Sequence, residues 1–323
     1  MNSIGRKLIP GIILGFLVLV ALAMIGDLKQ VGEVFSRFNW WMFPLALGLT
    51  LFNYGLRFVK FLYYLRLIGG EKIPWYEALR IFVAGFPLAV TPGKVGEALK
   101  GVWINQSSGV PVGKGISAIL AERISDGVAV LLLSTLGVFA YPQYWPAFGF
   151  ILILMMGLIM IIQIRPAALW LLGWGEKIPL VKNIMVHIRD IYEGSYTLFK
   201  PKPIAIAVGL GMVSWFGEGI GFYFILTGLG LIPDIKLFGL AVFVLSFSTV
   251  VGAVSALPGG LGAAEASIAG MLTLLGGIPA ATSTSATLLI RLATLWFGVL
   301  LGLIVWTFSL DFLGLRKQNG KMD

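Results

Sequence analysis

Two sets of residues recur at one spacing along the chain. Glu97, Pro111 and Arg123 are followed by Glu265, Pro279 and Arg291, with 168 residues between partners (265−97, 279−111, 291−123). A Pro-Gly break precedes each glutamate, in TPGKVGEALK and LPGGLGAAEA. These breaks interrupt apolar stretches, and non-helical backbone at membrane depth survives only where protein or water satisfies its N–H and C=O groups. A duplicated broken segment with buried charge indicates a transport site built from two copies of one unit.

Both arginines lie deep in apolar spans. At about 1.5 Å per helical residue, Arg123 is about 14 Å from Lys114 and Arg291 is about 15 Å from Ala281, near the middle of a hydrocarbon core about 30 Å thick. An ionised arginine at that depth costs about 2.5 to 3.5 kcal/mol. Each therefore requires an acid, an anionic ligand or water, and an ion pair that only fixes helix packing is the alternative to a substrate site.

The two copies differ around these arginines. Glu122 and Asp126 flank Arg123, whereas an isoleucine and a threonine occupy the matching positions around Arg291. Because i,i+3 neighbours share a helix face, we expect Arg123 to be neutralised within its own helix. Arg291 has no such neighbour, which makes it the better candidate for binding a substrate phosphate.

A second difference precedes the breaks. Aligning NYGLRFVKFLYYL with SWFGEGIGFYFIL at an offset of 161 places Arg57 opposite Glu218. Arg57 and Lys60, at i,i+3, fall on one helical face near the cytoplasmic end, although snorkelling to the interface also explains Lys60. These positions add two cations and one acid to the candidate site.

Helices that begin after the breaks would point their N-termini into the protein, where free N–H groups and the helix dipole favour anions. Carboxylates that stabilise these helix ends are the alternative role of the two repeated glutamates. The candidate substrate-binding residues are Arg291, Arg123, Arg57, Lys60, Lys100, Pro92, Gly93, Pro258, Gly259 and Gly260. The candidates for charge pairing or proton coupling are Glu97, Glu122, Asp126, Glu218 and Glu265.

The composition is that of an integral membrane protein, because 58% of the residues are hydrophobic, 12% are charged and the mean hydropathy is +0.93. The net charge of +9 favours cytoplasmic loops beside anionic lipid over nucleic-acid binding. With no cysteine and His187 as the single histidine, disulfides and thiol catalysis are excluded, and thiolate or multi-histidine metal sites are improbable. We therefore predict no catalytic residue, metal or cofactor.

The hydropathy pattern predicts an all-α fold with about six transmembrane helices and two re-entrant helix pairs in an inverted repeat. The predicted spans are 8–25, 40–65, 114–140, 144–164, 204–228 and 280–308, and the re-entrant pairs are 78–107 and 238–277. The first span also resembles a signal peptide, since two basic residues precede it and Ala21-Leu22-Ala23 resembles a cleavage site.

Most lysines and arginines fall on one side of this arrangement, which predicts that both termini are cytoplasmic in a multi-pass protein of the cell membrane. The predicted divisions of the single membrane domain are an N-terminal helix and linker (1–38), a first repeat (39–140), a connecting segment (141–203), a second repeat (204–310) and a basic tail (311–323). In the connecting segment, Val181, Ile184, Met185, Ile188, Ile191 and Tyr192 share one helical face. That face predicts an interfacial amphipathic helix, with a partner-binding helix as the alternative.

Four segments, GLRFVKFLYYLRLIGG, TPGKVGEALKG, AERISDGVAVLLL and ALPGGLGAAEASI, resemble the lysylphosphatidylglycerol synthase transmembrane region family. This family is the flippase-like module of bacterial multiple peptide resistance factors and also occurs as stand-alone proteins. The resemblance extends from about Asn39 to Leu310. In the resistance factors a soluble aminoacyl-transferase domain follows this module. The chain ends at Asp323 without one, so we do not expect lysylphosphatidylglycerol synthesis.

The resemblance implies translocation of a lipid, and the charge pattern suits an anionic phospholipid or a polyprenyl-phosphate-linked lipid as the partner. A proton-coupled secondary transporter of a small anion is the second hypothesis, and a membrane-embedded transferase is the third. A lateral groove open to lipid would favour the first and a closed aqueous vestibule the second. The sequence leaves the oligomeric state open.

Overall fold

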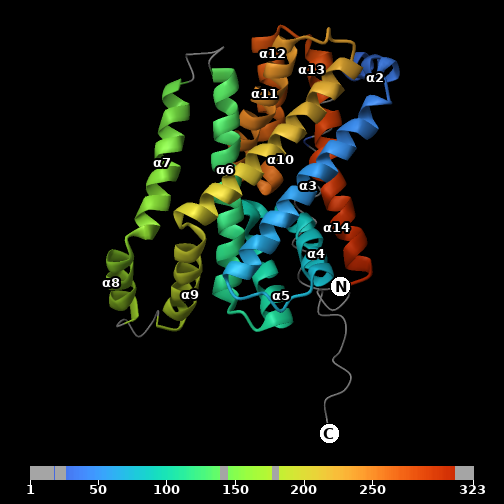
Figure 1. The fold of residues 1–323 in the computed structure, drawn as a ribbon. Helices are drawn as coiled ribbons and strands as arrows, with labels where there is room; N and C mark the ends of the chain where they lie inside the picture. The colour runs from blue at the N-terminus through green and yellow to red at the C-terminus, as the bar shows by residue number, and fades with distance from the viewer. Residues whose placement is uncertain (1–17, 19–26, 139–144, 177–181, 310–323) are drawn as a thin grey trace.

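The computed structural model describes residues 18, 27–138, 145–176 and 182–309. Within these ranges every regular element is helical, which confirms the predicted all-α class (Figure 1). Five stretches are long and apolar enough to cross a membrane: Met42–Leu67, Pro201–Gly228, Ile235–Val254, Pro258–Gly276 and Ala280–Thr307. A shorter apolar helix covers Gly149–Gln163. Apart from Val18, the predicted first span (8–25) lies outside the described residues.

Helices α3 (Met42–Leu67) and α10 (Pro201–Gly228) form the central pair. They pack along much of their length and run in opposite directions (Figure 1). Small residues on α10 permit the approach, because a Cβ at Gly228 would lie 3.0 Å from the Met42 Cβ of α3. This pairing places Arg57 of α3 opposite the middle of α10.

The helices that carry the two repeated arginines also run in opposite directions (Figure 1). One is α6 (Val112–Val138), which contains Arg123. The other consists of α13 (Ala280–Arg291), a π-helical turn η5 (Leu292–Trp296) and α14 (Phe297–Thr307). Both match predicted spans, although α6 carries buried charge and is not among the five apolar stretches.

Two helical hairpins enter the bundle from opposite ends (Figure 1). The first consists of α4 (Trp75–Ala84), η1 (Phe86–Val90), η2 (Pro92–Ala98) and α5 (Leu99–Ser108), and the second of α11 (Ile235–Val254), η4 (Pro258–Gly260) and α12 (Ala263–Gly276). Their tips meet, because η4 packs against both η1 and η2. The two segments that carry the Pro-Gly breaks are therefore in direct contact. The second hairpin is longer than expected, since 235–254 and 258–276 are each long enough for a full span.

Backbone contact at the second tip depends on glycine. Gly260 has φ +68°, and a Cβ there would lie 2.9 Å from the Cα of Gly252. A side chain at this position would therefore meet both backbone strain and a steric clash. Two glycines thus allow η4 to lie directly against the last turn of α11.

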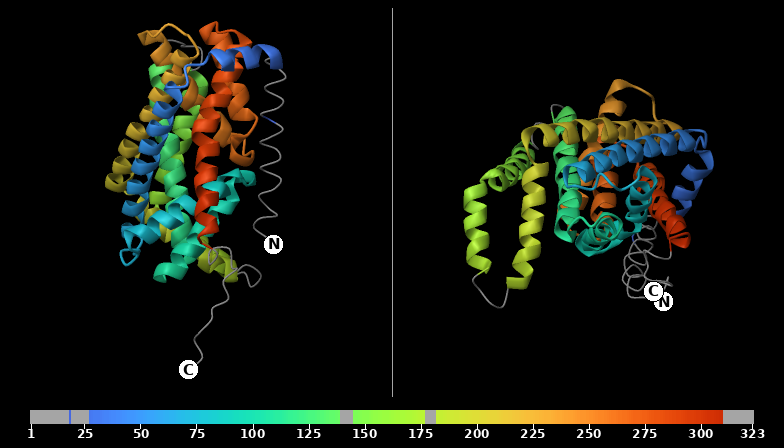
Figure 2. Two further views of the ribbon diagram at one scale, coloured as in Figure 1. Left: turned by 90° about the vertical axis from the view of Figure 1, so that its right-hand side faces the viewer. Right: turned by 60° about the horizontal axis from the view of Figure 1, so that its bottom comes forward.

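The remaining described helices are α2 (Leu28–Arg37), α7 (Trp145–Gln163), α8 (Arg165–Glu176) and α9 (Lys182–Leu198). Figure 2 shows α7 and α8 displaced to one side, with α9 between them and the bundle. The predicted interfacial helix corresponds to α9, which packs along α6 and does not lie across the end of the bundle. Close approach explains the difference, since a Cβ at Gly113 would lie 2.7 Å from the His187 carbonyl.

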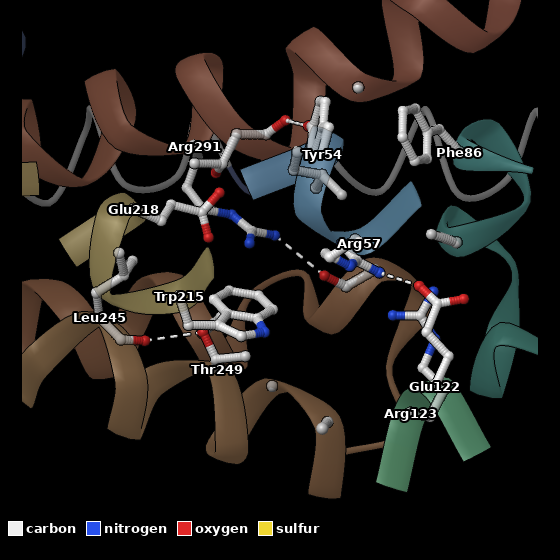
Figure 3. A pocket seen from close by; sticks show the side chains of 18 of the residues that line it. Tyr54, Arg57, Phe86, Glu122, Arg123, Trp215, Glu218, Leu245, Thr249 and Arg291 are labelled. Carbon is white, nitrogen blue, oxygen red and sulfur yellow. Dashed lines mark hydrogen bonds and ion pairs between the residues drawn. The ribbon is translucent and has the colours of Figure 1, made fainter. Parts of the chain in front are cut away.

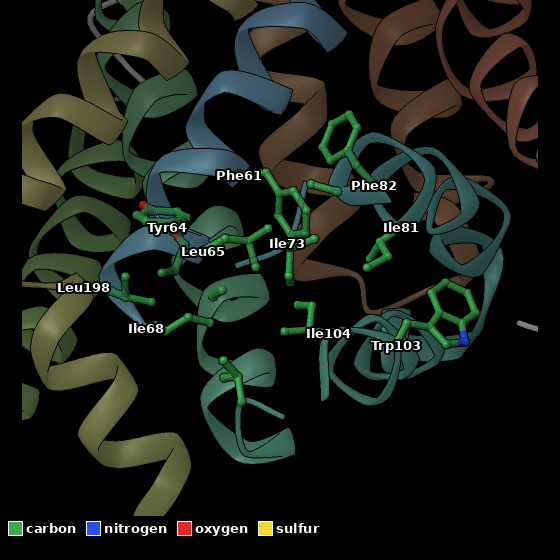
Figure 4. Packing of buried hydrophobic residues seen from close by; sticks show 14 of the residues in the cluster. Phe61, Tyr64, Leu65, Ile68, Ile73, Ile81, Phe82, Trp103, Ile104 and Leu198 are labelled. Atoms are coloured by element: carbon green, nitrogen blue, oxygen red, sulfur yellow. The ribbon is translucent and has the colours of Figure 1, made fainter. Parts of the chain in front are cut away.

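Apolar packing forms two large clusters and one small one. The first joins α3, α4, α5 and α6 around Phe61, Tyr64 and Phe82, all at most 1% exposed (Figure 4). The second joins α10, α11, α12 and α13. The small cluster lies at the tips, where Val90 and Leu261 pack with Val299. Each hairpin also packs against a helix distant in sequence, α4 against α14 and α11 against α6, and the tips pack against one another.

Candidate functional site

A cavity of about 150 Å³ lies where the hairpin tips meet the crossing helices. Its ionisable lining residues are Arg57, Lys100, Glu122, Arg123, Glu218 and Arg291. Figure 3 shows most of these side chains converging from α3, α6, α10 and α13. All six are among the predicted substrate-binding or charge-pairing residues, and the fold brings residues more than 200 positions apart into one site.

Arg57 is anchored by two acids of α6. Its Nη2 donates to Glu122 Oε1 at 2.7 Å, and its Nε lies 3.3 Å from Asp126 Oδ2. The guanidinium carbon also lies 5.9 Å from the ring centre of Trp215, within cation–π range. Lys60 pairs with Asp126 and is fully buried. The snorkelling alternative for Lys60 is therefore wrong, because the α6 carboxylate holds its ammonium inside the bundle.

Arg123 pairs with Glu97, not with Glu122 and Asp126 as expected. Its Nε and Nη2 donate to the Glu97 carboxylate at 2.7 to 2.9 Å, a bidentate arrangement. The Arg123 side chain is 30% exposed, whereas Glu97 is 2% exposed. The physical reason is competition, since Arg57, Lys60 and Lys100 occupy the two α6 acids. Lys100 Nζ lies 3.5 Å from Glu122 Oε2.

Arg291 has the same kind of partner in the second copy. Its Nε lies 2.6 Å from Glu265 Oε1, and its Nη2 donates to the Gly259 carbonyl at 3.0 Å. The repeated spacing of 168 residues thus corresponds to one repeated ion pair between a hairpin tip and a crossing helix. Arg291 is therefore no less paired than Arg123, which corrects the expected contrast between them.

The predicted free helix N-termini are occupied by groups of the chain itself. The other carboxylate oxygen of Glu265 accepts the Gly262 N–H at 2.7 Å at the start of α12. In the first hairpin, Thr91 Oγ1 accepts the Gly96 N–H at 2.9 Å. The role of Glu265 in stabilising a helix end is thus realised, together with its role in the ion pair.

Glu218 differs from the other four acids of the site. It is 4% exposed and lines the cavity, yet its carboxylate forms no hydrogen bond or ion pair with any residue in the described part of the chain. Arg57 and Arg291 line the same cavity, but both are paired elsewhere. One turn earlier, the buried Trp215 Nε1 likewise lacks a hydrogen-bond partner within the described ranges. The site therefore contains both an unpaired acceptor and an unpaired donor among the described residues.

The other predicted tip residues have varied positions. Gly259 lines the cavity, whereas Pro258 and Gly260 support the tip without lining it. The backbone of Pro92 and Gly93 starts η2, but their side-chain surroundings lie outside the described part of the structure. Among the described residues, no three of the metal-binding residue types lie close enough to hold a metal ion.

Sequence reasoning missed the aromatic residues of the cavity. Tyr54 and Trp215 line it, three residues before Arg57 and Glu218, respectively. The same offset of 161 relates them (215−54), so the repeat contained the necessary signal. The Tyr54 hydroxyl donates to the Thr294 carbonyl at 2.7 Å, within the π-helical turn η5. π-turns inside α-helices often occur at functional sites, and this one could not be predicted from composition.

Residues 11–302 match the family described as the lysylphosphatidylglycerol synthase TM region. A UPF0104 membrane protein of Methanothermobacter thermautotrophicus is 24% identical, and the match covers 89% of each chain. No solved structure matches the chain.

Proposed function

Because the chain belongs to the lysylphosphatidylglycerol synthase transmembrane region family, we propose that this multi-pass membrane protein is a flippase-like translocase of an anionic lipid. The headgroup would carry a phosphate, as in an anionic phospholipid or a polyprenyl-phosphate-linked lipid. The match covers the transmembrane region of that family, so the proposal concerns lipid movement and not aminoacyl transfer.

The observation that carries the proposal is the set of cationic side chains around the buried cavity. Arg57 and Arg291 use Nε and Nη2 in their contacts, and neither Nη1 donates a hydrogen bond to a described residue. Guanidinium groups present further N–H donors in a fork that suits phosphate oxygens. Trp215 Nε1 supplies another donor. Together these groups are suited to hold one phosphate while keeping their structural partners.

The apolar surroundings of the tips favour a lipid over a soluble anion. The cavity extends to Ala253, at the end of α11, and the adjacent residues include Val254, which is 71% exposed, and Leu257, which is 41% exposed. On η2, Val95 is 75% exposed. Because an aqueous vestibule would leave these side chains in water at a cost, we infer that acyl chains lie along the tips while the headgroup enters the cavity.

We further propose that 39–140 and 204–310 are inverted repeats, joined by 141–203, preceded by 1–38 and followed by 311–323. Supporting this division are the opposite directions of α3 and α10, and of α6 and α13–α14 (Figure 1).

The end of the bundle that carries α8 and α9 would face the cytoplasm, since most lysines and arginines lie in the segments at that end. A cysteine at Ile188, in a chain without native cysteines, should then resist an impermeant maleimide applied to intact cells. Labelling from outside would contradict the orientation.

Reconstitution tests the function directly. Wild-type protein in liposomes should increase the rate at which a headgroup-labelled phosphatidylglycerol becomes accessible from the opposite leaflet. Arg57→Gln and Arg291→Gln should each abolish most of this increase, whereas Arg165→Gln, at a surface pair with 48% of the arginine side chain exposed, should not. Equal rates for wild type and both cavity variants would refute the proposal. Transport of glycerophosphoglycerol without lipid movement would instead establish the small-anion alternative.

A further inference from the structure

Glu218 is the one acid of the site whose role the proposed function leaves unexplained. Its side chain is buried and lines the cavity, and no described residue bonds to its carboxylate. Burying an ionised carboxylate without a partner is costly. The position therefore requires either a proton on Glu218 or a ligand beside it.

The charge count of the site shows what a proton would change. Among the described side chains that line the cavity or are connected to a lining residue through successive ion pairs, five are cationic and five are carboxylates. The cations are Arg57, Lys60, Lys100, Arg123 and Arg291, and the carboxylates are Glu97, Glu122, Asp126, Glu218 and Glu265. With Glu218 ionised this set is neutral, and with Glu218 protonated it carries one positive charge, which equals the charge needed to balance one phosphodiester.

The elements packed against α10 define the surroundings of Glu218. From α3, Tyr54 and Arg57 face the cavity, and from α13, Arg291 does so. From α6, Asp126 contributes a repulsive charge, while the other α6 acid, Glu122, is bound by Arg57 and Lys100. The polar side chains of α11 that line the cavity are those of Ser248 and Thr249, and both carry hydroxyl groups. Both cations near Glu218 are thus the groups to which the headgroup would bind.

The repeat also explains why Glu218 alone is unpaired. Arg57, its counterpart in the first half, is held by Glu122 and Asp126, and the second half has Ile290 and Thr294 at the matching positions. Because Glu218 is an acid at the position that matches Arg57, it would need a cation where Arg57 has two acids. Neither Ile290 nor Thr294 supplies one. An ionised Glu218 would therefore compete with an incoming phosphate for Arg57 and Arg291. It would also repel the phosphate, because like charges repel in a buried site.

We propose that the anionic headgroup enters the cavity together with one proton, which is held on the carboxyl group of Glu218. The proton comes from solvent and returns to it when the headgroup leaves, and no other bond forms or breaks. The protonated carboxyl can donate a hydrogen bond to a phosphate oxygen, so repulsion becomes attraction. This inference rests on the proposed function, because it assigns the cavity to the headgroup.

The sign of the pH dependence follows directly. Because the anion binds the protonated site, its affinity is highest at the lower pH values where Glu218 of the free protein is already protonated. The affinity falls as the pH rises above that range. One linked proton gives about a tenfold rise in Kd per pH unit in the sloping region. A phosphodiester stays singly charged between about pH 5 and pH 9, so a slope there belongs to the protein.

The experiment measures binding of phosphatidylglycerol to purified full-length protein in detergent between about pH 5 and pH 9, together with proton uptake in weakly buffered solution. In the sloping region, wild type should show the tenfold rise in Kd per pH unit and take up one proton per lipid bound. Glu218→Gln should bind with a Kd that does not change with pH and with no proton uptake. Glu33→Gln, at an exposed acid of α2, should behave as wild type.

The possible outcomes separate the two proposals. A pH-independent Kd in wild type, or an unchanged slope in Glu218→Gln, would overturn the role of Glu218 while leaving the headgroup site intact. No binding at any pH would overturn both. If Glu218→Gln does not fold, proton uptake by wild type alone decides the matter. Glycerophosphoglycerol serves as the soluble arm, and binding of it as tight as that of the lipid would assign the site to a free anion.

Discussion

Glu265→Gln is the substitution whose effect follows most directly from the contacts of the site. Glu265 is fully buried, with one oxygen 2.6 Å from Arg291 Nε and the other accepting Gly262 N–H at 2.7 Å. Glutamine keeps an amide oxygen for Gly262 but removes the charge opposite Arg291. Since the Arg291 side chain is only 13% exposed, water replaces the lost partner poorly. We expect the free energy of unfolding to fall by about 3–5 kcal/mol, the usual cost of breaking a buried pair.

Three companion variants separate the contributions. Glu265→Ala also removes the helix cap and should cost about 0.5–2 kcal/mol more. The double variant Glu265→Gln, Arg291→Gln removes the stranded charge and should recover most of the loss, because neutral replacement of a whole buried pair is often tolerated. Glu97→Gln, the matched control in the first half, should cost less than Glu265→Gln, since Arg123 is 30% exposed and water screens it.

Denaturant titration in detergent, followed by the fluorescence of the ten tryptophans, measures these differences. A loss below about 1 kcal/mol for Glu265→Gln would mean that the pair contributes no more than a surface ion pair. A double variant no more stable than Glu265→Gln would show that Arg291 is not stranded. Either result would refute the assignment of Glu265 as the structural partner of Arg291.

Three further predictions concern the tips and the π-turn. Tyr54→Phe removes the hydrogen bond to the Thr294 carbonyl and should lower the free energy of unfolding by about 1 kcal/mol, whereas Tyr223→Phe, whose hydroxyl bonds to no described residue, should not. Gly260→Ala should abolish folded expression, because Gly260 has a φ of +68° and the new Cβ would clash with Gly252. The control Gly270→Ala should be tolerated, because nothing lies within 4 Å of its new Cβ. Cysteines replacing Val90 and Leu261, which pack in one tip cluster, should crosslink with a short bifunctional reagent, and separate labelling without crosslinks would contradict the contact between the tips.

The repeat and its buried charges could be predicted from the sequence, whereas the pairing of those charges could not. A spacing of 168 residues is visible without coordinates, and it corresponds to the Arg123–Glu97 and Arg291–Glu265 pairs. The i,i+3 rule instead favoured Asp126 as the partner of Arg123. That rule describes an isolated helix, and here α3 brings cations to the face of α6 that carries Asp126. Tertiary packing therefore decided which acid each arginine binds.

Local features that depend on a few atoms were also beyond the sequence pattern. The π-helical turn after Arg291 begins within an ordinary apolar run, LATLW, that contains no breaker residue. The packing of α9 along α6 depends on Gly113 and Gly194, whose meaning appears only when the two helices are side by side. The amphipathic pattern of α9 does not by itself distinguish protein from lipid as the partner of its apolar face.

The distribution of ion pairs bears on how much energy a rearrangement of the two halves would require. Every buried ion pair found among the described residues joins groups of the same proposed half: Arg57, Lys60, Lys100 and Arg123 pair within 39–140, and Arg291 pairs within 204–310. The polar contacts found between the halves are hydrogen bonds, such as those from Tyr54 to Thr294 and from Trp306 to Ala84. Separating opposite charges in a low-dielectric interior would cost several kcal/mol per pair, whereas an exchanged hydrogen bond costs about 1 kcal/mol. A movement of one half relative to the other would thus leave every one of these ion pairs intact.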